Sequence, residues 1–245
     1  MNARWQKIVV FLIAMTTGGV VIADTLTFYG QASDPETGQA LYQEVHRLTL
    51  DDDGQPLSEI VEYVSADREL LGEKTLTYNR LSQPDYVVDF RQRPYTEKVR
   101  IISDQIVIDR QQQTQLALPE ASFAIDGGFH YFIQQHFDTL VSGSDVDFQF
   151  LSAGRATFIP LTIVPVDQSQ NRLTLELRLQ NFLLSRLVNP IVLTYDIPTL
   201  QLVSYEGLTN VPDGDGKLYN AVITYQYPEN MISGATTLTS PAKAQ

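Results

Sequence analysis

Three residues with acid–base side chains are spaced two apart near the start of the chain. Tyr42, Glu44 and His46 occupy alternate positions of residues 40–50, a segment with the pattern of a β-strand. Alternate residues of a strand project from one face, so a phenol, a carboxylate and an imidazole are predicted to lie side by side. A carboxylate beside an imidazole can act as a general base. Glu44, His46 and Tyr42 are therefore the candidate catalytic residues, with a surface pair of strand neighbours as the alternative.

The other two histidines, His130 and His136, lie in residues 126–143, where apolar side chains recur at helical spacing. This spacing predicts one amphipathic helix, with Asp126 as its N-cap and Gly143 at its end. His136 falls within the apolar stripe, either as a polar point of a ligand cavity, as a pH-sensitive group or as a neutral, hydrogen-bonded core histidine. His130 follows Asp126 by one turn, which permits an Asp–His pair. The candidate cavity residues on this helix are His136, Phe132, Phe129 and His130.

Other familiar reaction centres are missing from the sequence. The chain has no cysteine, which excludes disulfides, zinc–thiolate sites, iron–sulfur clusters and thiol nucleophiles. The phosphate-binding, dinucleotide-binding, nucleophile-elbow and H-E-x-x-H motifs are also absent, and residues 142–145 (Ser-Gly-Ser-Asp) lack catalytic partners. The acidic segments 51–53 and 213–216 do not fit a calcium-binding loop and are interpreted as hairpin turns. We expect neither a metal nor a cofactor.

The charge of the chain limits its partners. The formal net charge is −12 and the isoelectric point is about 4.6. A nucleic-acid-binding protein needs a basic surface to neutralise phosphates, so we expect no nucleic-acid partner. Hydrophobic residues make up 43% of the chain, which is normal for a globular protein.

Residues 1–23 have the pattern of a secretory signal peptide. Arg4 and Lys7 come before an apolar stretch at residues 8–22, and Ala23 follows it as the last residue before the expected cleavage site. The stretch is shorter than the roughly 20 residues of a membrane-spanning helix. We expect cleavage, with an uncleaved anchor as the alternative. Cleavage leaves 222 residues and removes two of the 17 basic but none of the 29 acidic residues, which changes the net charge to −14. The mature chain is then predicted to be periplasmic or secreted, with no membrane span.

The remaining sequence consists of strands and turns around the one predicted helix. Residues 173–180 alternate Leu with polar residues, the pattern of an antiparallel sheet with one dry and one wet face. We predict a mainly β fold: a strongly curved antiparallel sheet or open β-barrel with one amphipathic helix packed against it. Residues 24–227 are expected to form a single domain, and residues 228–245 a weakly structured tail. Further strands are predicted at residues 26–31, 60–64, 74–78, 86–91, 98–102, 105–110, 146–150, 156–166, 191–195, 200–205 and 217–227.

Three short stretches carry a family resemblance. They are Thr-Gly-Gln-Ala-Leu-Tyr-Gln-Glu-Val-His at 37–46, Asp-Gly-Gly-Phe-His-Tyr-Phe-Ile at 126–133 and Tyr-Glu-Gly-Leu-Thr-Asn at 205–210. They resemble segments of an uncharacterised family of exported bacterial proteins, a resemblance that implies no particular activity. The strand–helix–strand layout is also similar to the half-barrel of periplasmic lipoprotein carriers, although a shared fold does not imply a shared function.

Three functional hypotheses remain open from the sequence. The first is a non-catalytic binding protein for an apolar or lipid-like ligand, or for a partner at the cell envelope. The second is a hydrolase-like enzyme acting on an envelope component, and a cavity joining His46 to His130 or His136 would favour it. The third is an acidic protein-interaction module.

Overall fold

The computed structural model describes residues 24–181, 190–229 and 231. The predicted signal peptide lies outside the described residues, as does the predicted tail except for Pro228, Glu229 and Met231. Among the described residues, no helix combines the length and the apolar character needed to cross a membrane.

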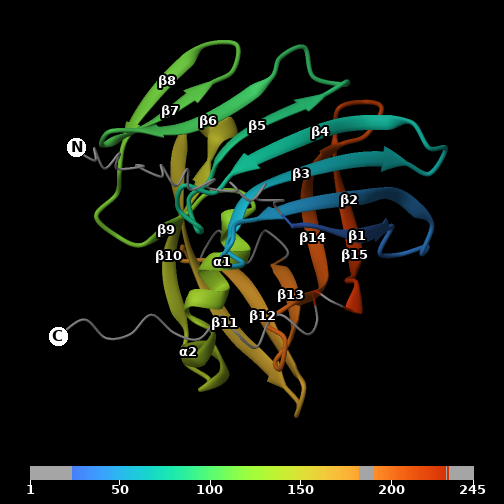
Figure 1. The fold of residues 1–245 in the computed structure, drawn as a ribbon, viewed down its shortest axis with the longest axis vertical. Coiled ribbons are helices and arrows are strands. Elements are labelled where there is room, and N and C mark those ends of the chain that lie inside the picture. The colour runs from blue at the N-terminus through green and yellow to red at the C-terminus, as the bar shows by residue number, and fades with distance from the viewer. Residues whose placement is uncertain (1–23, 182–189, 230, 232–245) are drawn as a thin grey trace, which may run out of the picture.

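One open, curved sheet of 15 strands forms the fold (Figure 1). The first eight strands, the N-terminal arm, are β1 (Thr25–Ser33), β2 (Ala40–Leu50), β3 (Pro56–Ser65), β4 (Leu70–Thr77), β5 (Asp85–Phe90), β6 (Glu97–Ile102), β7 (Gln105–Asp109) and β8 (Gln113–Ala117). The last seven, the C-terminal arm, are β9 (Phe123–Ala124), β10 (Val146–Ser152), β11 (Thr157–Gln168), β12 (Arg172–Leu179), β13 (Ile191–Asp196), β14 (Leu202–Pro212) and β15 (Leu218–Gln226).

Each arm is a meander, and the two arms join where β1 pairs with β15. All neighbouring strands are antiparallel except β9 and β10. The middle of the sheet is therefore built from the two ends of the described chain. The predicted fold class, a curved antiparallel sheet with helical packing on it, is confirmed.

Alternation of residue types explains how individual strands form. In β12, Leu173, Leu175 and Leu177 are buried, while the polar residues between them face outward. At the turn between β2 and β3, Gly54 adopts a φ of +76°, a left-handed conformation that favours glycine. Pro165 lies beside a register shift between β11 and β12, as expected for a proline inside a sheet.

The helical segment differs from the prediction in its continuity. It forms two short helices, α1 (Gly128–Gln135) and α2 (Phe137–Val141), interrupted at His136. The Nδ1 atom of His136 lies 2.9 Å from the Phe132 carbonyl oxygen, which a continuous helix would use to accept the His136 backbone N–H. That N–H instead donates to the Ile133 carbonyl oxygen at 3.0 Å. The side chain of His136 thus competes for the carbonyl and breaks the helix.

The predicted helix ends also differ in part. Gly127, not Asp126, is the N-cap of α1, because the Asp126 carboxylate instead accepts a hydrogen bond from the Lys74 ammonium. Asp126 itself has a φ of +42°. Gly143 ends the segment as predicted, with a φ of +84° and its N–H donating to the Leu140 carbonyl oxygen.

Both helices lie on the inner side of the curved sheet (Figure 1). Their apolar side chains, among them Phe132, Ile133 and Leu140, pack on inward-facing residues of β10–β13. We call this group the second core. The first core consists mainly of inward-facing residues of β1–β7, with contributions from β9, β10, β14 and β15.

Candidate functional site

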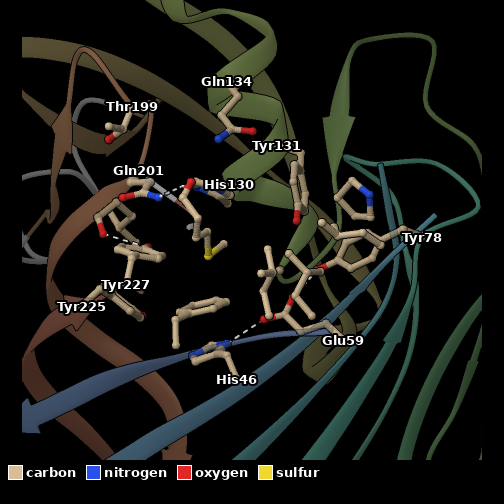
Figure 2. Close-up of a pocket in the computed structure, with 18 of the residues that line it drawn as sticks. His46, Glu59, Tyr78, His130, Tyr131, Gln134, Thr199, Gln201, Tyr225 and Tyr227 are labelled. Atoms are coloured by element: carbon tan, nitrogen blue, oxygen red, sulfur yellow. Dashed lines mark hydrogen bonds and ion pairs between the residues drawn. The ribbon is translucent and has the colours of Figure 1, made fainter. Parts of the chain in front are cut away.

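A cavity of about 530 Å³ lies on the inner face of the sheet, between α1 and the strands at the middle of the sheet (Figure 2). We call it the central cavity. Its volume falls within the roughly 300–1,000 Å³ range of small-molecule sites. Its apolar and aromatic lining residues include Leu26, Phe28, Leu48, Phe129, Tyr131, Leu193, Tyr195, Leu202, Tyr205, Tyr225, Tyr227 and Met231. Its polar lining residues include His46, Glu59, His130, Gln134, Thr199 and Gln201.

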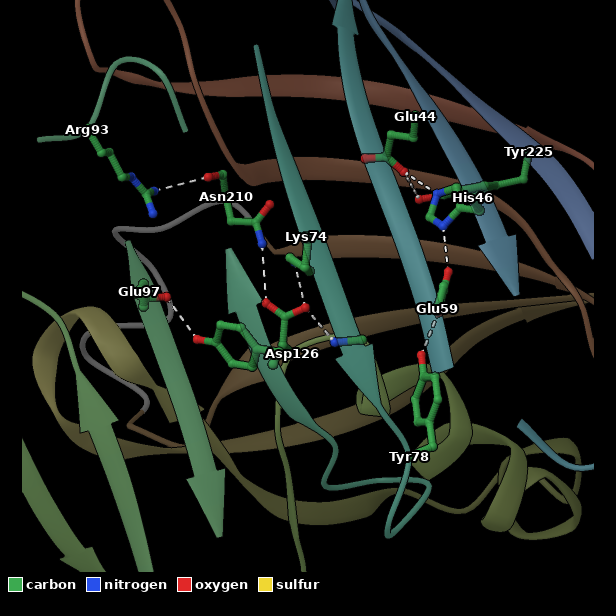
Figure 3. Close-up of polar contacts among 12 residues, drawn as sticks. Glu44, His46, Glu59, Lys74, Tyr78, Arg93, Glu97, Asp126, Asn210 and Tyr225 are labelled. Carbon is green, nitrogen blue, oxygen red and sulfur yellow. Dashed lines mark hydrogen bonds and ion pairs between the residues drawn. The ribbon is translucent and has the colours of Figure 1, made fainter. Parts of the chain in front are cut away.

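His46 is held between two carboxylates in the wall of the central cavity (Figure 3). Its Nδ1 atom lies 2.6 Å from Glu59 Oε1, and its Nε2 atom lies 3.0 Å from Glu44 Oε2. The ring of Phe28 stacks on the imidazole with centroids 4.3 Å apart. A carboxylate only accepts hydrogen bonds, so both ring nitrogens of His46 carry protons and the ring is an imidazolium.

The pKa values agree with this assignment. Burial opposes protonation of His46, but its hydrogen bonds to Glu44 and Glu59 outweigh burial and raise its pKa to about 9. Burial likewise opposes ionisation of Glu59, yet the hydrogen bond and charge of His46 lower the pKa of that carboxyl below its ordinary value. Two carboxylates around one imidazolium give the group a net charge of −1.

Two tyrosines complete the hydrogen bonding of these carboxylates. The Tyr78 hydroxyl donates to Glu59 Oε2 at 2.5 Å, and the Tyr225 hydroxyl donates to Glu44 Oε2 at 3.1 Å. Burial, together with the charge of Glu59, raises the pKa of Tyr78 well above its ordinary value. The phenol therefore stays protonated and remains a donor.

His130 faces the same cavity from α1 and has the opposite electrostatic character (Figure 2). Its Nδ1 atom lies 3.2 Å from the Tyr195 hydroxyl, and the two rings are parallel within 7°. Burial lowers the pKa of His130 to about 4, so the ring is neutral at physiological pH. The cavity thus holds one charged and one neutral histidine.

Of the three candidate catalytic residues, the structure brings one to the wall of the cavity. Tyr42, Glu44 and His46 share the inner face of β2, but only His46 lines the central cavity. Glu44 is hydrogen-bonded to His46 but does not line the cavity, and Tyr42 is 1% exposed within the first core.

The helix candidates divide in the same way. Phe129 and His130 line the cavity, while Phe132 and His136 are not among its lining residues. The Phe132 ring instead stacks on Phe148 in the second core, and His136 is half-buried and bonded to the backbone. The Asp–His pair that the helical spacing permits does not form between Asp126 and His130, because the Asp126 carboxylate accepts a hydrogen bond from Lys74 and the His130 imidazole is hydrogen-bonded to Tyr195.

An ion pair fixes the start of α1 beside the cavity (Figure 3). Lys74 Nζ donates to Asp126 Oδ1 at 2.6 Å, and the lysine is only 4% exposed. The Asn210 side-chain amide adds a longer contact of 3.4 Å to the other carboxylate oxygen, and the Asn210 backbone carbonyl oxygen accepts a hydrogen bond from Arg93 at 3.1 Å. Strands from both arms thereby hold the segment that enters α1.

Glu59, Tyr78 and Lys74 are site residues that no local motif in the sequence marks. The β2–β3 register pairs Leu48 with Glu59 and His46 with Val61, which makes Glu59 the diagonal neighbour of His46 on the inner face. A β-bulge between Thr49 and Leu50 shifts this register, so the hairpin turn predicted at 51–53 does not by itself place Glu59 beside His46.

The acidic turns use their carboxylates internally. Asp51 Oδ1 accepts the backbone N–H groups of Asp53 and Gln55, at 3.0 and 2.7 Å. Asp213 Oδ1 accepts those of Asp215 and Lys217, at 3.0 and 2.8 Å. These are hairpin-turn contacts. Within the described ranges, no group of three or more His, Asp or Glu side chains is arranged to hold a metal ion.

The fold and the cavity define an open antiparallel β-sheet protein with a central cavity under an inner helix. The sequence matches no family model and no curated protein. Among solved structures, it is similar to the crystal structure of a beta-barrel-like protein of domain of unknown function DUF1849 from Brucella abortus. The TM-score is 0.35 at 8% identity, over 84% of this chain and 98% of that chain. At this distance the likeness carries no conclusion about function.

Proposed function

We propose that the chain is a non-catalytic binding protein that takes an apolar, lipid-like ligand into the central cavity. The observation that carries this proposal is the lining of the cavity, where aliphatic and aromatic side chains surround a small number of fixed polar groups. Such a composition is typical of small-molecule sites. Export to the periplasm or the medium, predicted from residues 1–23, remains part of the proposal.

The hydrogen bonding of the histidines supports binding over catalysis. A general base needs a nitrogen lone pair that faces the substrate, whereas both nitrogens of His46 donate to carboxylates. His130 has a pKa of about 4, which makes it a poor base at neutral pH. One observation does favour the alternative, a hydrolase-like enzyme: His46 and His130 line the same cavity, as that hypothesis requires.

Native mass spectrometry tests the proposal most simply. The protein is purified from its own host without detergent, and we expect a fraction of it to carry an extra mass that organic solvent releases. Isothermal titration with decyl maltoside, below its micelle concentration, then measures binding of a neutral probe. A ligand-free protein that also fails to bind this probe would contradict the proposal.

A matched pair of variants places the probe in the cavity. Leu26→Trp puts a bulky ring into the lining, while Ile60→Trp puts the same ring on an exposed position of β3 outside it. We expect the first to weaken probe binding by about tenfold or more, which corresponds to about 1.4 kcal/mol, and the second to leave it unchanged. Equal effects would show that the probe binds elsewhere.

A further inference from the structure

The charged side chains that line the central cavity are mostly acidic. Its described lining includes four acidic residues and neither lysine nor arginine. The acidic residues are Asp24, Asp53, Glu59 and Asp126. The buried Lys74 does not line the cavity, and its ammonium is already paired with Asp126. An anionic headgroup would thus meet no basic side chain among the described lining residues except the imidazolium of His46.

His46 offers little to an anion. Both of its N–H groups are directed at carboxylates, at 2.6 and 3.0 Å, and the Phe28 ring covers one face of the imidazole. The two carboxylates exceed its charge by one unit. An anion placed beside the group would therefore be repelled, and a cation would be attracted, more strongly than in water because the surroundings are partly desolvated.

Aromatic rings surround this negatively charged group. Phe28 stacks with Tyr227 at a centroid distance of 5.0 Å, and Tyr78, which bonds Glu59, meets Tyr131 edge to face at 5.1 Å. All four rings line the cavity, together with Tyr195, Tyr205 and Tyr225. The faces of aromatic rings attract cations, and quaternary ammonium groups are recognised in this way.

His130 adds no positive charge to oppose such a ligand. It lies on α1 across the cavity, and burial keeps it neutral at physiological pH. The remaining polar groups of the lining, such as Gln134, Thr199 and Gln201, are uncharged.

We infer that the ligand of the central cavity is a cationic amphiphile, in which an alkyl or aromatic body carries an amine or quaternary ammonium group. This inference rests on the proposed function. The cationic group lies near Glu59 and the rings of Phe28 and Tyr227, and the apolar body extends towards the leucines of the lining, among them Leu193 and Leu202. Anionic lipids and fatty acids are excluded by the same charges.

Three probes with one alkyl chain test the inference: decyltrimethylammonium, decyl sulfate and decyl maltoside, each titrated calorimetrically below its micelle concentration. We expect the ammonium probe to bind at least about tenfold more tightly than the sulfate, with the maltoside between them. Sulfate binding that equals or exceeds ammonium binding would overturn the inference while leaving the proposed function intact. Failure of all three probes to bind would instead overturn the proposed function.

The acidic net charge of the whole chain also attracts cations, so a matched pair of variants is needed. Glu59→Gln and Glu62→Gln each remove one carboxylate from β3, and each carboxylate is ion-paired to a residue of β2, His46 or Arg47. Only Glu59 lines the cavity. We expect Glu59→Gln to weaken ammonium binding about tenfold relative to maltoside binding, and Glu62→Gln to leave that ratio unchanged. Equal changes in the two variants would contradict a site at Glu59.

Retained maltoside binding is the check that Glu59→Gln is folded. Tyr227→Leu is the second variant, because it removes a ring face without changing the charge or the Glu59 contacts. We expect it to reduce the preference for the ammonium over the maltoside probe several-fold. An unchanged preference in both Glu59→Gln and Tyr227→Leu would overturn the inference.

Discussion

The two cores of the sheet differ in the kinds of side chain that are buried in and around them. The first core lies among strands that bury four charged side chains, Glu44, Glu59, Lys74 and Glu97, each with a hydrogen-bonding partner. The buried residues of the second core are apolar apart from the hydroxyl of Tyr195, and they support α1 and α2. Burying charge costs free energy even when the charge is paired, so apolar side chains would hold this part of the sheet together at a lower free-energy cost.

The position of the charges accounts for this difference. His46 with its two carboxylates, and Lys74 with Asp126, lie beside the central cavity or at the start of α1, whereas the second core lies between the helices and β10–β13. The second core holds the helices by apolar packing, and the first core supplies the polar wall that faces them. The cavity lies where the two meet.

The largest expected effect comes from breaking the buried ion pair. Lys74→Met leaves the Asp126 carboxylate without its ammonium and should lower the free energy of unfolding by about 4 kcal/mol. Arg47→Met breaks the more exposed pair with Glu62 on the outer face and should cost no more than about 1 kcal/mol. Urea denaturation measures both. Similar values would show that the inner and outer ion pairs are equivalent.

Next is a cavity-creating change in the second core. Leu175 is fully buried, and Leu175→Ala should lower the free energy of unfolding by about 3 kcal/mol. Leu175 does not line the central cavity, so the affinity for decyl maltoside should stay the same in the folded variant. A loss of affinity would contradict the separation of support from binding.

A pH effect of about 2 kcal/mol should come from His46. Its pKa rises from 6.5 in the unfolded chain to about 9 in the folded protein, so its stabilisation is complete below pH 6.5 and is lost as the pH rises through 9. We expect the free energy of unfolding to fall by about 2 kcal/mol between pH 7 and pH 9. In His46→Gln this alkaline loss should disappear, and its persistence would contradict a charged His46.

The smallest expected effect comes from His130 and has the opposite sign. Its pKa falls from 6.5 to about 4 on folding, so the unfolded chain takes up the proton first and stability declines as the pH falls from 6.5 towards 4. This should cost about 1 kcal/mol between pH 6 and pH 5. Comparison with His130→Gln over this range isolates the contribution, and identical slopes would contradict a neutral His130.

Local alternation was sufficient to predict much of the fold. The predicted strand at 40–50 coincides with β2, and the leucine alternation from 173 gives β12. Residues 113–117 were missed because Gln-Thr-Gln-Leu-Ala is an edge strand that is exposed on nearly all sides and needs no alternation. The strand predicted at 200–205 extends further in the structure, because β14 continues to Pro212. It passes through Gly207, whose φ of +148° is an unusual backbone conformation inside a strand.

The candidate site was predictable only where its residues are neighbours along one element. A period of two brought Glu44 and His46 together, whereas the second carboxylate, Glu59, depends on the register of a hairpin. The hydrogen bond from Tyr225 on β15 to Glu44 on β2 depends on the pairing of β1 with β15, which joins the two ends of the described chain. The pattern of a strand contains no signal for a contact at that sequence separation.

The most direct measurement is a crystal structure of the protein with decyltrimethylammonium. The account predicts density for the probe inside the central cavity, with the ammonium group close to Glu59 and the Phe28 and Tyr227 rings and the alkyl chain between α1 and β13–β14. Density only on the outer face of the sheet, or an ammonium group directed away from Glu59, would contradict the account.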